Sequence, residues 1–191
     1  MAASRTNQEI EIKLKVASAG SARRILRQAG FRVRRSRVFE DNVVLDTPEH
    51  ALRRAGKLLR MRRSTRERLL TYKGPAAPGR YKSREELEVT LAAGGRMPLI
   101  FERLGFVPVF RYQKYRTEYA RARENGVVTL DETPIGCFLE IEGAPRWIDR
   151  TARRLGFKAA DYITASYGGL YLGQRALEPL PPDMVFPGRA T

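Results

Sequence analysis

An early stretch of the chain reads Glu9-Ile10-Glu11-Ile12-Lys13-Leu14-Lys15-Val16, with every charged side chain at an odd position. Successive side chains of a β-strand point to opposite faces, so this stretch would present one charged face and one strictly apolar face. A solvated sheet surface has such a pattern, and so does the wall of a polar cavity. Because the same alternation recurs in later segments, the cavity is the favoured interpretation.

Alternation and β-rich composition predict eight strands along the chain, at residues 8–16, 32–46, 57–64, 67–74, 82–91, 109–122, 126–132 and 137–143. Helices are predicted at residues 19–29, 48–55, 96–104, 145–155 and 163–173. We therefore expect an α+β fold, an eight-stranded antiparallel β-barrel, or tunnel, with a polar, charged lumen and helices packed outside. Residues 1–174 would form this single domain. The segment 175–191, with four prolines after Leu177, would be an extended or disordered tail.

The composition limits the chemistry that this domain can perform. The chain of 191 residues has one cysteine, Cys137, and one histidine, His50, which excludes a disulfide framework and a metal site built on those residues. No apolar run approaches the roughly 20 residues of a membrane helix, and no secretory signal is evident, so we expect a cytoplasmic protein without a membrane partner. The net charge of +15 suits a polyanionic partner. Since the arginines are dispersed, a nucleic acid is the less favoured one, and the sequence leaves a homodimer open.

The charged faces of the predicted strands carry two sets of side chains. The carboxylates are Glu9, Glu11, Glu86, Glu88, Asp131, Glu140 and Glu142. The cations are Lys13, Arg60, Arg62, Lys73, Arg84, Lys114 and Arg116. Neighbouring carboxylates repel unless a cation lies between them, and oxygen ligands without histidine or cysteine suit Mg²⁺ or Mn²⁺. The remaining cations suit a substrate with several phosphates, which indicates metal-assisted phosphoryl transfer.

The same residues, in this order, resemble the CYTH superfamily, the triphosphate tunnel metalloenzymes, over about residues 7–173. The resemblance rests on Glu9-x-Glu11-x-Lys13, Leu59-Arg60-Met61-Arg62, Thr71-Tyr72-Lys73-Gly74-Pro75, Arg84-x-Glu86-x-Glu88, Lys114-x-Arg116, Leu130-Asp131 and Phe138-Leu139-Glu140-Ile141-Glu142. The runs around Lys73 and Glu86 look most like the class IV adenylyl cyclase branch. The run Asp46-Thr47-Pro48-Glu49 is also similar to thiamine triphosphatases.

The resemblance implies a role for each charged position. The metal ligands would be Glu9, Glu11, Glu140 and Glu142, with Asp131 nearby. The phosphate-binding residues would be Lys13, Arg60, Arg62, Lys73, Arg84, Lys114 and Arg116. Lys13, Lys73, Glu86 and Glu88 are the candidates for catalytic roles, and Mg²⁺ or Mn²⁺ is the expected cofactor.

Three functions fit such a tunnel. We favour a hydrolase of inorganic triphosphate or of a small organic triphosphate such as thiamine triphosphate, because the attacking water is always available. The alternative is a class IV adenylyl cyclase that converts ATP to cyclic AMP and pyrophosphate, which also needs a nucleobase site and a base for the ribose hydroxyl. A non-catalytic module that binds polyphosphate or RNA ends is the second alternative.

Overall fold

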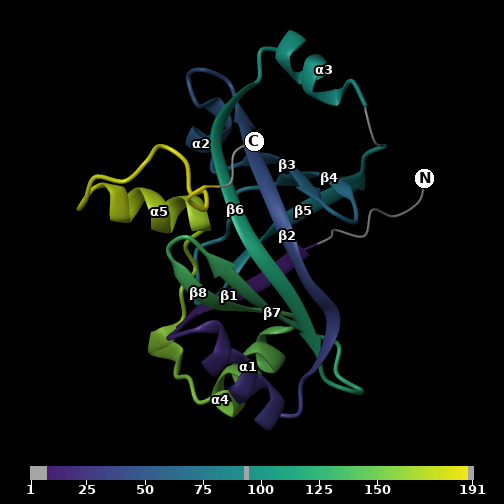
Figure 1. The fold of residues 1–191 in the computed structure, drawn as a ribbon, viewed down its shortest axis with the longest axis vertical. Helices are drawn as coiled ribbons and strands as arrows, with labels where there is room; N and C mark the ends of the chain where they lie inside the picture. Colours follow the sequence, from purple (N-terminus) through teal and green to yellow (C-terminus); the bar gives the residue numbers. More distant parts are fainter. Residues whose placement is uncertain (1–7, 93–94, 189–191) are drawn as a thin grey trace.

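The computed structural model describes residues 8–92 and 95–188, and its strands form a closed antiparallel barrel (Figure 1). The strands are β1 (Gln8–Val16), β2 (Arg32–Asp46), β3 (Leu58–Ser64), β4 (Arg68–Lys73), β5 (Lys82–Thr90), β6 (Val107–Ala120), β7 (Val127–Thr133) and β8 (Gly136–Glu142). Their order around the barrel is β1-β5-β4-β3-β2-β6-β7-β8. The eight predicted strands are thus confirmed, each to within about two residues.

The helices lie outside the barrel and are α1 (Ala19–Gln28), α2 (Ala51–Arg54), α3 (Met97–Arg103), α4 (Pro145–Arg154) and α5 (Tyr167–Arg175), with a 3₁₀ helix at Ala159–Asp161. The last helix begins later than predicted. Ile163 instead exchanges two backbone hydrogen bonds of 2.9 Å with Lys13 of β1. Ser166 then caps α5, its hydroxyl accepting the backbone N–H of Gly169. None of the helices within the described residues has the length and apolarity to cross a membrane.

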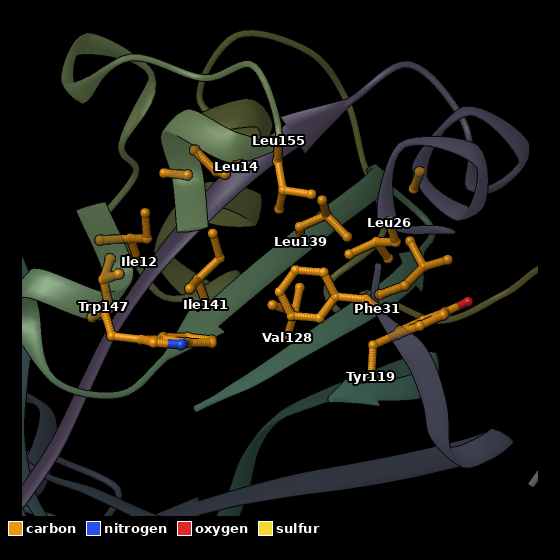
Figure 2. Packing of buried hydrophobic residues seen from close by; sticks show 14 residues of the cluster. Ile12, Leu14, Leu26, Phe31, Tyr119, Val128, Leu139, Ile141, Trp147 and Leu155 are labelled. Atoms are coloured by element: carbon orange, nitrogen blue, oxygen red, sulfur yellow. The ribbon is translucent and has the colours of Figure 1, made fainter. Parts of the chain in front are cut away.

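The main hydrophobic core lies between the outer wall of the barrel and helices α1 and α4 (Figure 2). On β1, Ile12 and Leu14 are fully buried in this core, whereas Lys13 between them faces the lumen. Trp147 of α4 packs its ring against Gly126, and its indole N–H donates to Glu124 at 2.8 Å. The predicted arrangement, apolar side chains outward and charged ones inward, is therefore confirmed on this side of the barrel.

The helical cover of the barrel is incomplete over β5, the neighbour of β1 in the barrel. The outer face of β5 carries Leu87 and Val89, which remain 49% and 54% exposed. The helices α1 and α4 pack instead against β1, β7 and β8. The apolar alternation of β5 thus marks a strand of the barrel wall without implying a helix over it.

The tail after α5 lies along the edge of β6. Strand β7 pairs with β6 only over Tyr115–Tyr119, which leaves the preceding residues of β6 with a free edge. There Met184 donates its N–H to Arg111 O at 3.0 Å and accepts the N–H of Gln113 at 2.9 Å. Met184 is fully buried beside Tyr112, Tyr167 and Tyr171. Residues of the tail as far as 188 are described, and Met184 holds this segment against β6.

Candidate functional site

The lumen of the barrel holds a cavity of about 620 Å³. Alternation along the strands sends the charged side chains inward, and the cavity is lined by nearly all of the predicted site residues. These are Glu9, Glu11, Lys13, Arg60, Arg62, Lys73, Arg84, Glu86, Glu88, Lys114, Arg116, Glu140 and Glu142. Asp131 alone among the predicted residues lies behind the lining.

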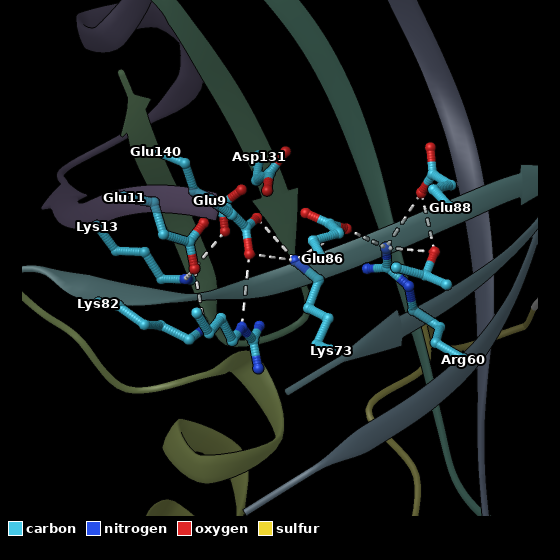
Figure 3. Close-up of polar contacts among 12 residues, drawn as sticks. Glu9, Glu11, Lys13, Arg60, Lys73, Lys82, Glu86, Glu88, Asp131 and Glu140 are labelled. Carbon is cyan, nitrogen blue, oxygen red and sulfur yellow. Dashed lines mark hydrogen bonds and ion pairs between the residues drawn. The ribbon is translucent and has the colours of Figure 1, made fainter. Parts of the chain in front are cut away.

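One group of contacts surrounds Lys13 (Figure 3). Its Nζ lies 3.2 Å from Glu11 Oε1 and 3.1 Å from Glu140 Oε1. Burial alone would lower the pKa of Lys13, but the two carboxylates outweigh burial and raise it above its usual value. Lys82 of β5, a residue that the sequence interpretation missed, places its Nζ 2.8 Å from the same Glu11 oxygen. The Glu11 carboxylate is therefore held between two ammonium groups.

A second group surrounds Lys73, which Figure 3 shows between Glu9 and Glu86. The Lys73 Nζ lies 2.7 Å from both Glu9 oxygens and 3.2 Å from Glu86 Oε1. Arg84 adds a longer contact, 3.4 Å from its Nε to Glu9 Oε2. Three strands, β1, β4 and β5, thus bring their charges to one point.

Asp131 holds the cations of β6 from behind. Its Oδ2 accepts from Lys114 Nζ at 2.8 Å and from Arg116 Nη2 at 2.6 Å, and its Oδ1 accepts from Arg116 Nε at 2.7 Å. The hydroxyl of Tyr167 also donates to Oδ2, at 2.8 Å. Asp131 is fully buried and both its oxygens are occupied, so the geometry fits a role in positioning Lys114 and Arg116 better than direct metal ligation.

Arg60 and Arg62 of β3 have different surroundings. Arg60 donates to the hydroxyls of Tyr112 and Thr71, at 3.0 and 3.1 Å, and lies 3.8 Å from a Glu88 oxygen. Arg62 Nε lies 3.2 Å from Asn42 Oδ1 and 3.5 Å from Glu40 Oε2. Glu40 is a buried carboxylate of β2 that the sequence interpretation did not place in the lumen.

Glu142 of β8 is a carboxylate of the cavity lining that no cation contacts among the described residues. The Glu142 side chain has no hydrogen bond or ion pair within the described part of the chain. Removal from water and the nearby carboxylates, Glu9 and Glu11 foremost, raise its pKa to about 7. Burial and the charge of Glu11 likewise raise the pKa of Glu9.

A bound divalent cation would neutralise the negative charge of Glu142 and of the nearby Glu9 and Glu11. Carboxylate oxygens are the ligands that Mg²⁺ and Mn²⁺ prefer. The residues therefore fit the expected metal. The site is not assembled in advance, however, since within residues 8–92 and 95–188 no three or more His, Cys, Asp or Glu side chains are arranged to hold a metal ion. Glu9, Glu11 and Glu140 are occupied by lysine and arginine side chains, which would have to move.

Part of the cavity lining is apolar. Val44, Leu58, Phe110 and Leu172 contribute apolar side chains to it, and Ser166 and Arg175 add polar ones. The apolar four lie on β2, β3, β6 and α5, and none of them belongs to the predicted site. The cavity thus combines charged and apolar lining.

Known proteins resemble this chain in sequence and in structure. A model of the CYTH domain matches residues 7–167. A candidate adenylate cyclase of Methanocaldococcus jannaschii is 30% identical over 135 residues, which cover 70% of this chain and 75% of that protein. The solved PH1819 protein of Pyrococcus horikoshii OT3 is 27% identical, with a TM-score of 0.73 over 87% of this chain and 99% of that one.

A more distant solved structure is a candidate adenylyl cyclase from Hippeastrum, described as having a dominant triphosphatase activity. It is 20% identical, with a TM-score of 0.62 over 91% of this chain and 98% of that one. At this identity the likeness concerns the fold.

Proposed function

Because the chain belongs to the CYTH domain family, we propose that this triphosphate-tunnel enzyme is a divalent-metal-dependent triphosphate hydrolase. The observation that carries the proposal is the lumen itself, in which six predicted carboxylates and seven predicted cations line one cavity of about 620 Å³. A site with cations alone would suit simple binding of a polyanion. Buried carboxylates in similar number would repel that anion unless a metal ion joined it.

The charged residues divide by chemistry. Mg²⁺ or Mn²⁺ would be held by Glu9, Glu11, Glu140 and Glu142, and when bound it would supply positive charge to the phosphate oxygens. Arg60, Arg62, Lys114 and Arg116, the last of which also contacts Glu140, would bind the phosphates, arginine through paired N–H donors and lysine as a compact charge.

Lys13, Lys73 and Arg84 start out paired with the metal-binding carboxylates. With Mg²⁺ or Mn²⁺ held by the carboxylates, these cations would be free to bind the substrate phosphates, since each carboxylate would have exchanged one positive partner for another. Glu86 and Glu88 would orient Lys73 and Arg60, and we place them in that role before any direct role in proton transfer.

The apolar part of the lining favours an organic triphosphate over the inorganic ion. A cavity of about 620 Å³ lies within the range of roughly 300–1,000 Å³ that holds drug-sized ligands. Phe110 and Leu58 would contact the organic group while the phosphates extend to the charged residues of the lining. The dominant triphosphatase activity described for the Hippeastrum protein supports hydrolysis as the reaction.

An adenylyl cyclase is the second candidate, favoured by the adenylate cyclase name of the Methanocaldococcus jannaschii relative. This reaction requires the 3′-hydroxyl of ATP to reach the α-phosphorus, so the ribose would have to lie among the charged residues of the lining. Ser166 and Arg175 are polar groups of the lining that could bind such a nucleoside.

Product identification separates these functions. The purified protein is incubated with Mg²⁺ or Mn²⁺ and, separately, with inorganic triphosphate, thiamine triphosphate and ATP, and the products are resolved by phosphorus NMR. Orthophosphate that disappears with EDTA supports the hydrolase, and cyclic AMP with pyrophosphate supports the cyclase. Binding of polyphosphate or RNA that needs no metal, without turnover, would overturn both and support a binding module.

A further inference from the structure

The lumen does not end at the main cavity. A second, much smaller cavity of about 30 Å³ continues it between the far ends of β2, β3 and β6. Arg62 and Arg116 line both cavities, whereas Glu40 lines only the second. Glu40 therefore lies next to the two arginines that the cavities share, and the second cavity is also lined by Arg35, Arg66, Glu67 and Glu118.

The Glu40 carboxylate is a fixed negative charge at this junction. Its side chain is almost wholly buried, with Oε2 3.5 Å from Arg62 Nε and 3.7 Å from Lys114 Nζ. That oxygen accepts no hydrogen bond from the described residues. Burial alone would raise its pKa, but Lys114 and Arg62 outweigh burial and lower it to about 2. Glu40 is thus ionised at neutral pH.

We propose that Glu40 is a specificity-determining residue that ends the phosphate row and excludes polyphosphates longer than three phosphates. The inference rests on the proposed function, because it requires Arg62, Lys114 and Arg116 to bind phosphates. A fourth phosphate would lie against a buried carboxylate, where repulsion is much stronger than in water. A like charge placed against the wrong ligand is an effective means of discrimination.

The inference is tested with two variants and one matched control. Glu40→Gln removes the charge while keeping the shape, and Glu40→Ala also removes volume. Glu132→Gln makes the same change of charge at a residue outside the cavity lining, where Glu132 pairs with Arg23 and Arg37. Calorimetry in Mg²⁺ gives the Kd of inorganic triphosphate and of inorganic tetraphosphate for each protein.

We expect the wild-type protein and Glu132→Gln to bind triphosphate more tightly than tetraphosphate. In Glu40→Gln the ratio of the two Kd values should shift toward tetraphosphate by about tenfold, and in Glu40→Ala by at least as much. Equal weakening of both anions, with the ratio unchanged, would mean that Glu40 only orders Arg62 and Lys114 and would overturn the inference. A wild-type protein without preference for triphosphate would overturn it too.

Turnover is measured in parallel, which keeps this inference separate from the proposed function. A shifted Kd ratio without hydrolysis of any triphosphate would retain Glu40 as the length filter and reject the hydrolase. Hydrolysis of a triphosphate with an unshifted ratio of Kd values would support the hydrolase and reject Glu40 as the length filter. A wild-type protein that binds neither anion would overturn the inference about Glu40, whereas the proposed function would be overturned only if thiamine triphosphate and ATP were not hydrolysed either.

Discussion

Lys82 and Glu11 form the shortest contact of the Lys13 group, 2.8 Å from Nζ to Oε1, although neither motif nor prediction singled out Lys82. Because Lys82 is buried in the cavity wall, its ammonium group has only the metal-binding carboxylates and a bound substrate as partners. We infer that it moves from Glu11 to a phosphate when a metal binds.

Replacement of this lysine is therefore expected to weaken substrate binding. Lys82→Met should raise KM for the preferred triphosphate by about tenfold or more, since a hydrogen bond to a charged group contributes roughly 1.5–3 kcal/mol. Steady-state kinetics measure the effect. Lys15→Met, on an exposed lysine of β1 outside the cavity lining, serves as the control and should leave KM unchanged. Equal KM values for the two variants would exclude Lys82 from the phosphate site.

The raised pKa of Glu142 predicts pH-dependent metal binding. The carboxyl is protonated below about pH 7 and must lose its proton to ligate a metal, so affinity should rise with pH. We expect Mn²⁺ to bind the substrate-free protein about tenfold more tightly at pH 8 than at pH 6. Titration followed by electron paramagnetic resonance measures this. Glu142→Gln should bind Mn²⁺ weakly with a flatter pH profile, and an unchanged profile would remove Glu142 from the metal site.

Asp131 should be a major determinant of stability. Asp131→Asn leaves Lys114 and Arg116 buried with a neutral partner, and breaking such a buried network typically costs about 3–5 kcal/mol. Urea unfolding gives the free energy directly. The milder variant Tyr167→Phe removes one hydrogen bond to the same carboxylate and should cost about 1–3 kcal/mol. If Asp131→Asn lowered the free energy of unfolding no more than Tyr167→Phe does, this would contradict the role of Asp131 in positioning Lys114 and Arg116.

Glu40 should make stability depend on pH in the acid range. Its pKa is lowered from 4.5 to about 2 in the folded protein, so the ionised carboxylate stabilises the fold above pH 4.5. This contribution, about 3 kcal/mol in full, is lost progressively as the pH falls toward 2. Urea unfolding between about pH 6 and pH 3 should therefore show a steeper loss for wild type than for Glu40→Gln. Parallel curves of unfolding free energy against pH for the two proteins would show that Lys114 and Arg62 do not lower the pKa of Glu40.

Gly126 tests the packing of α4 on the barrel. A Cβ at this position would lie 2.4 Å from ring atoms of Trp147, which fills the space above the glycine. Gly126→Ala should therefore lower stability by about 1–3 kcal/mol through overpacking. Gly173→Ala, in α5 with nothing within 4 Å of the new methyl group, should be neutral or stabilising by up to about 1 kcal/mol. Thermal unfolding of both variants decides the comparison.

The sequence predicted the strands well because one alternation served two purposes, an apolar face for the core and a charged face for the lumen. Lys82 could have been found by the same rule, since it shares a face of β5 with Arg84 and Glu86.

Glu40 was harder to assign from the sequence. It lies among Asp41 and Asn42 in a long strand, and irregularities in the pairing of β2 with β6 change the register between Val33 and Val38. Simple alternation therefore does not carry through β2. The role of Asp131 depended on contacts from β6 and α5, and long-range contacts of that kind leave no local pattern.

The hydrogen bonds of Met184 to β6 have a practical consequence for handling the protein. They occupy the backbone N–H of Gln113 and the carbonyl of Arg111, which would otherwise have no partner on the part of β6 that β7 does not cover. A chain shortened after Arg175 would lose this cover while keeping every charged residue of the main cavity lining, and its exposed edge would template pairing between molecules. Shortened versions prepared for crystallisation should therefore end beyond Phe186, whose N–H is bonded to Gln113 of the same strand.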